Sequence, residues 1–99
     1  LGSINLARLV NAPFEPRAGI DEGELERLTE TAIRFLDDVI DVSRYPLEAQ
    51  ATEARAKRRI GLGVTGLADA LIFCGAAYGS DAAVALTERW MGAIKCAAY

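Results

Sequence analysis

Hydrophobic residues recur with the spacing of an α-helix over the middle of the chain. They fall at i, i+3, i+7, i+10, i+11, i+14 and i+15, namely Leu25, Leu28, Ala32, Phe35, Leu36, Val39 and Ile40. Charged residues fill the opposite face, and Asp21 followed by Glu24 resembles the capping box that opens many helices. The pattern predicts a long amphipathic helix that begins at Asp21 and stops at Tyr45-Pro46, because the residue before a proline is driven out of the α region.

Shorter patterns predict the remaining elements. Alternating residues from Ile4 to Val10 favour a short strand, and the prolines that follow favour a loop. A polar surface helix is expected over residues 47–58, then a glycine-rich passage and a helix from Leu67 to Cys74. Ser80 is placed to cap a last amphipathic helix. The fold class is therefore mainly α, with about four helices and one or two short strands.

Length and composition narrow the function classes. The 99 residues make one small domain or one piece of a larger one, and the absence of histidine excludes Ser-His-Asp catalysis and His-ligated zinc. The net charge of −3 argues against a nucleic-acid partner, and no apolar run is long enough to span a membrane. Two cysteines without a signal peptide favour a cytoplasmic setting. Because the chain begins at Leu1 and ends within helical sequence at Tyr99, we expect it to be a segment of a longer protein.

A glycine motif is the first candidate for chemistry. Gly61, Gly63 and Gly66 match the G-x-G-x-x-G dinucleotide fingerprint, and a predicted helix follows them. The buried strand that should precede the first glycine is replaced by a basic stretch, and Asp81, 20 residues after Gly61, opens a helix instead of ending a strand. We therefore expect these glycines to allow close packing and not to bind NAD.

Two charged clusters have a structural and a functional interpretation. The basic residues Arg55, Lys57, Arg58 and Arg59 are suited to phosphate contacts, but we expect a solvated helix end whose cations complement the helix dipole. Asp37, Asp38 and Asp41 are suited to a metal or an acid–base pair, but their position opposite the apolar stripe favours exposed solubilising charge.

The remaining polar and thiol side chains show no catalytic pattern. Cys74 and Cys96 lie among apolar residues in helical sequence, where a free cysteine usually behaves as a small buried hydrophobe. Ser3, Asn5 and Thr65 are interpreted as strand and turn residues. We assign no catalytic, cofactor-binding or metal-ligating residue within the chain.

Three segments carry a family resemblance. Residues 1–6, residues 35–46 and above all Arg58–Leu71, with its Arg-Arg-Ile-Gly-Leu-Gly stretch, resemble the catalytic subunit of ribonucleotide reductase, and most closely its adenosylcobalamin-dependent class. Lys57 stands where many members have asparagine, which leaves the class open. The resemblance covers essentially the whole chain.

The resemblance implies a fold and an activity for a longer protein. That family reduces ribonucleotides to deoxyribonucleotides by radical chemistry inside a ten-stranded α/β barrel, and its reactive cysteines would lie outside residues 1–99. The implied cofactor of the parent enzyme is adenosylcobalamin, and the implied partners are a nucleotide substrate and the rest of the barrel. Residues 4–10 and 60–64 would be barrel strands, and the helices would cover the outside.

Two other hypotheses remain beside this scaffold role. One is an autonomous helical interaction module without catalytic activity, and the other is a dinucleotide-binding unit. We also expect the chain to form a homo-oligomer through the stripes Leu25–Ile40 and Val84–Ala98, with Phe35 and Trp90 at the centre.

Overall fold

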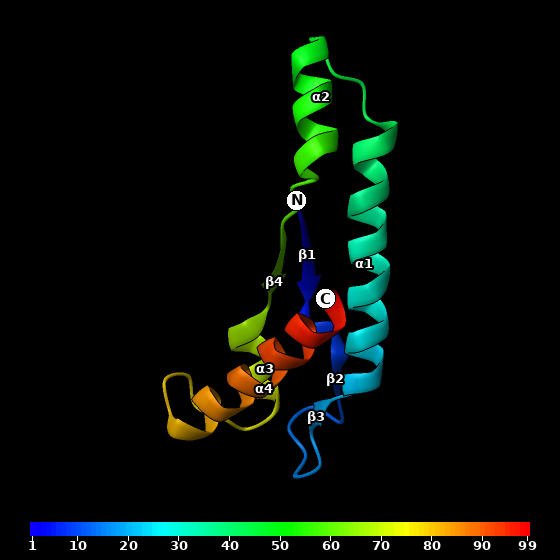
Figure 1. Ribbon diagram of the computed structural model, residues 1–99. Coiled ribbons are helices and arrows are strands. Elements are labelled where there is room, and N and C mark those ends of the chain that lie inside the picture. Colours follow the sequence, from blue (N-terminus) through cyan, green and yellow to red (C-terminus); the bar gives the residue numbers. More distant parts are fainter.

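The computed structural model describes residues 1–99, which form an elongated body of 54 × 23 × 20 Å. Helix α1 (Glu22–Val42) runs along most of its length, and α2 (Glu48–Lys57) stands beside the far end of α1 (Figure 1). Helix α3 (Leu67–Phe73) and α4 (Asp81–Ala98) gather near the start of α1. The predicted mainly helical fold is confirmed.

The helix ends follow the local capping chemistry of the sequence. The Asp21 side chain accepts a hydrogen bond from the Glu24 backbone N–H at 3.2 Å, which confirms the predicted start of α1. The Ser80 hydroxyl accepts from the Ala83 N–H at 3.2 Å and caps α4 in the same way. As predicted, α2 is a surface helix, since none of its residues is buried.

The strands form two small sheets. Strand β1 (Gly2–Asn5) pairs in parallel with β4 (Leu62–Thr65), although the whole of α1 and α2 separates them in sequence. Strands β2 (Val10–Asn11) and β3 (Gly19–Ile20) form a short antiparallel ladder. The predicted barrel strand over residues 60–64 is thus present as a strand, shifted by one or two residues.

The first strand is shorter than the predicted Ile4–Val10. After Asn5 the chain enters a 3₁₀-helix, η1 (Leu6–Leu9), because the Asn5 side chain accepts a hydrogen bond from the Ala7 N–H at 3.1 Å. This local cap competes with strand geometry and turns the chain. Leu6, the first residue of η1, is buried together with Ile4 of β1.

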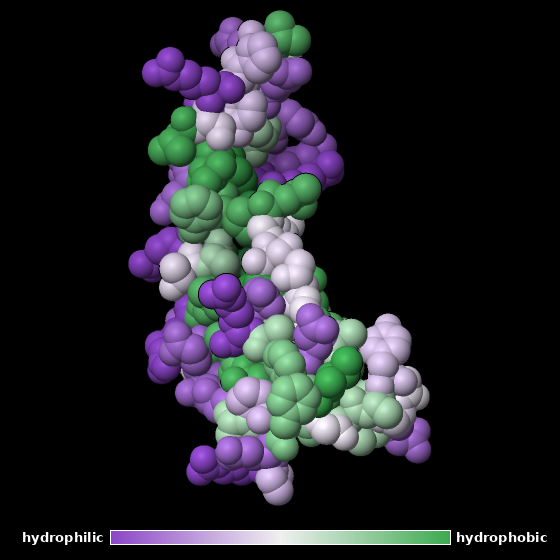
Figure 2. Space-filling model, turned by 180° about the vertical axis from the view of Figure 1, so that it is seen from behind, coloured by the Kyte–Doolittle hydropathy of each residue, from purple (hydrophilic) through white to green (hydrophobic).

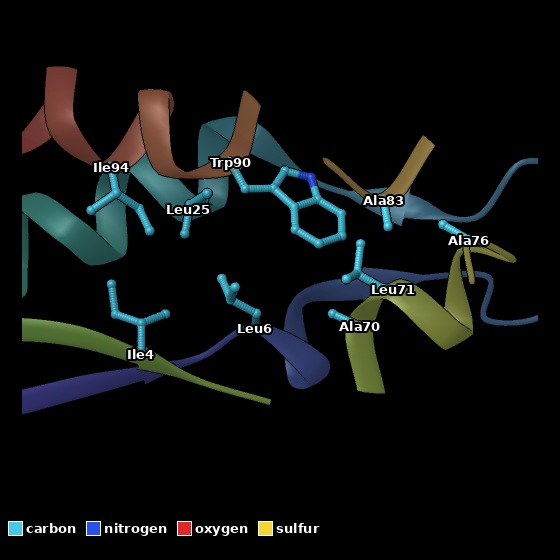
Figure 3. Packing of buried hydrophobic residues seen from close by; sticks show 9 residues of the cluster. All are labelled: Ile4, Leu6, Leu25, Ala70, Leu71, Ala76, Ala83, Trp90 and Ile94. Carbon is cyan, nitrogen blue, oxygen red and sulfur yellow. The ribbon is translucent and has the colours of Figure 1, made fainter. Parts of the chain in front are cut away.

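A single hydrophobic cluster joins the elements (Figure 3). Ile4 and Leu6 face Leu25 of α1 and Trp90 and Ile94 of α4, and Ala70, Leu71, Ala76 and Ala83 extend the cluster. Trp90 is only 2% exposed. The prediction that Trp90 anchors a dimer is therefore wrong, because its ring is buried in the core of its own chain.

The core is small for the length of the chain. Twelve of the 99 residues are buried, so many large hydrophobic side chains remain at the surface. Hydrophobic patches are visible along the face opposite to that of Figure 1 (Figure 2). None of the helices is both long and apolar enough to span a membrane.

Candidate functional site: the parallel strand pair and its anchoring arginine

The parallel strand pair brings together two of the segments that carry the family resemblance, residues 1–6 and Arg58–Leu71. The register pairs Gly2 with Leu62 and Asn5 with Thr65, and the Gly2 N–H donates to the Gly61 carbonyl at 2.9 Å. Two of the three small polar candidates, Asn5 and Thr65, therefore meet at the carboxyl edge of the pair. The Asn5 side chain accepts a hydrogen bond from the Ala7 N–H as a local cap, which supports the structural interpretation.

Gly66, directly after β4, lies against the backbone that follows β1. Its φ is +71°, and a Cβ built there would lie 2.6 Å from Asn5 Oδ1 and 3.2 Å from the Ala7 nitrogen. A side chain at this position would therefore collide with the cap that turns the chain after β1. The predicted packing role is confirmed at Gly66.

The other two glycines of the motif are less constrained. A Cβ at Gly61 would approach only the flexible side chain of Leu1, at 2.5 Å. At Gly63 nothing lies within 4 Å, so the predicted close packing is wrong at this position. One glycine of the three carries the tight contact.

The geometry of the motif differs from a dinucleotide site. Strand β4 lies between Gly61 and Gly66, whereas the Rossmann fingerprint follows its strand. The helix after the motif has only seven residues, and Asp81 begins α4 instead of ending a second strand. The arrangement lacks the strand that would direct a helix N-terminus at a pyrophosphate.

Arg58 joins the end of α2 to α1. Its Nε donates to Asp37 Oδ1 at 2.9 Å, and Nη1 and Nη2 donate to the two carboxylate oxygens of Asp41 at 2.9 and 3.1 Å. Nη2 also donates to the Asp37 carbonyl at 3.1 Å. Only arginine offers this planar fork of donors, which here binds two carboxylates and a backbone carbonyl within one turn of α1.

The electrostatics follow from this contact. Hydrogen bonding by the guanidinium lowers the pKa of Asp41 from its usual range, and the same bonds from Asp41 and Asp37 raise the pKa of Arg58. The two aspartates are thus not merely solubilising charge, and the interpretation of Arg58 as a solvated helix end is wrong. Asp38 remains an exposed charge, as predicted.

The backbone of Arg58 explains why the contact matters for the strand pair. The residue adopts the left-handed conformation, with φ 46° and ψ 50°, and caps α2 through its N–H to the Ala54 carbonyl at 2.8 Å. Such a conformation is costly for a residue with a side chain and persists only where its surroundings hold it. It turns the chain from α2 toward β4, which begins four residues later. Arg58 therefore fixes the direction in which the chain leaves α2 and enters β4, the strand that pairs with β1.

The two cysteines differ in their environments. Cys74 is half-buried, and burial raises the pKa of its thiol. Cys96 is exposed on α4, so the prediction that it is buried is wrong. It follows the buried Ile94 by two residues, which turn it about 200° around the helix and onto the opposite face. Both cysteines are free.

No group of three or more histidine, cysteine, aspartate or glutamate side chains is placed to hold a metal ion. What the arrangement does is mechanical: it holds two parallel strands in register, with helices on their flanks. This is the kind of unit from which α/β barrels are built.

Comparison with known proteins identifies the class. The family model described as ribonucleotide reductase, barrel domain, matches residues 1–99, and the chain belongs to this family. The predicted resemblance is confirmed.

Individual relatives agree with the family. The chain is 50% identical, over all of its 99 residues, to a vitamin B12-dependent ribonucleoside-diphosphate reductase of Mycobacterium tuberculosis, of which it covers 14%. A protein of the same name from Thermoplasma acidophilum is 43% identical over 95% of the chain and is covered to 12%. A ribonucleoside-diphosphate reductase subunit alpha of Chlamydia trachomatis is 42% identical over 89% of the chain, with 8% covered. The chain thus spans about one seventh or less of the length of these relatives.

Proposed function

We propose that the chain supplies a strand-and-helix unit to the barrel of a vitamin B12-dependent ribonucleoside-diphosphate reductase, an enzyme that makes deoxyribonucleotides for DNA synthesis. One observation carries the proposal: the match to the barrel family and to the mycobacterial relative extends over all 99 residues. The parallel pairing of β1 with β4 supports it, because parallel strands are the building element of such barrels.

The role we propose for this unit is scaffold. β1 and β4 would be two neighbouring strands of a ten-stranded barrel, and α1, α3 and α4 would lie outside them. The remainder of the reductase chain would be the immediate partner, the substrate a nucleotide, and the location the cytoplasm.

The cofactor of the proposed enzyme would be adenosylcobalamin, which supplies the radical when bound. The residues of this chain do not fit its cobalt, since histidine is absent and no group of potential ligands converges. We therefore derive no step through the cofactor and propose that other parts of the reductase hold it. For the same reason the 99 residues alone are expected to show no nucleotide reduction with a thiol reductant.

A segment exchange tests the scaffold role. The matching 99 residues of the mycobacterial reductase would be replaced by this chain, and deoxyribonucleotide formation would be measured with and without adenosylcobalamin. We expect cofactor-dependent activity, since half of the residues are identical. A matched exchange carrying Gly66→Val should lose activity, because a branched side chain collides with the Asn5 cap. A correctly folded exchange protein that binds substrate but shows no turnover would contradict the proposal.

The alternative function, an autonomous interaction module, is favoured by one observation. Residues from β1, η1, α1, α3 and α4 close a core around Trp90 within the chain.

Titration with NAD and NADP tests the remaining hypothesis, a dinucleotide-binding unit, and we expect no saturable signal.

A further inference from the structure

We draw no further inference here: the strongest candidate, the exposed polar face of the β1–β4 pair formed by Ser3, Asn5 and Thr65, carries none, because nothing in the structure shows whether a ligand or another part of a longer chain covers it.

Discussion

Gly66→Ala is the substitution whose cost the structure defines most closely. The backbone at Gly66 has φ +71°, a conformation that disfavours any residue with a Cβ. Moving alanine into this region costs about 1 kcal/mol. The new methyl group would also lie 2.6 Å from Asn5 Oδ1 and 3.1 Å from the Ala7 Cβ, both well inside van der Waals contact.

The second part of the cost comes from the Asn5 cap. The side chain oxygen that the methyl group displaces accepts the Ala7 N–H, and losing a cap of this type costs about 1 kcal/mol, up to about 2. The backbone of η1 cannot retreat freely, because Leu6 is fully buried in the core. We therefore expect Gly66→Ala to lower the free energy of unfolding by about 2–3 kcal/mol in total.

Glycines elsewhere in the chain provide the matched controls. Gly75 has φ +78° with nothing within 4 Å of a Cβ, so Gly75→Ala should cost only the conformational part, about 1 kcal/mol. Gly63 has neither a positive φ nor a neighbour, and Gly63→Ala should be close to neutral.

Urea unfolding of the three variants, followed by circular dichroism, gives the differences from the transition midpoints. If Gly66→Ala is no less stable than Gly75→Ala, the contact with the Asn5 cap has no energetic weight and the reasoning fails.

Three further predictions concern other parts of the molecule. Trp90 is the only tryptophan and is buried, so its fluorescence emission should shift to longer wavelength on unfolding. Trp90→Ala should lower the free energy of unfolding by about 3–5 kcal/mol and leave little folded protein by circular dichroism. The lowered pKa of Asp41 means that its contribution to stability is present above the ordinary aspartate pKa of ~3.9 and is lost as the pH falls through the lower folded value. Urea midpoints across that range should therefore fall less steeply for Asp41→Asn than for the unsubstituted chain. Cys96 should react rapidly with a maleimide in the native state while Cys74 reacts slowly until urea is added, as peptide mass spectrometry would show; equal native rates would contradict the assigned exposures.

Local signals made the helices predictable. The apolar spacing of α1, the Asp21 cap and the Ser80 cap each depend on residues one or two turns apart, and the helices they predict are present. The stripe is buried only in part, since Leu28, Phe35 and Val39 are exposed. The strand Ile4–Val10 failed because two local preferences compete there. An asparagine that caps its own backbone overrode the alternation of apolar residues.

The contacts that hold the candidate site were not predictable in the same way, because they join distant parts of the chain. Arg58 lies 17 and 21 residues from its two carboxylate partners, and its left-handed backbone has no signature in a sequence without glycine or asparagine at that position. One signal was present: Asp37 and Asp41 are four residues apart and so share a face of α1. Two carboxylates one turn apart form a receptor for a guanidinium fork, and the basic cluster downstream contains three arginines as candidates.

The family resemblance and the structure meet at this contact. Asp37 and Asp41 lie in one of the three segments that carry the resemblance, and Arg58 opens another. In the folded chain the arginine binds both aspartates, and the strand that follows it pairs with β1, the third segment. The residues that look most like a reductase are therefore those that bring the two parallel strands together. A motif rich in arginine and glycine, which alone resembles a phosphate-binding site, is explained here by the mechanics of strand placement.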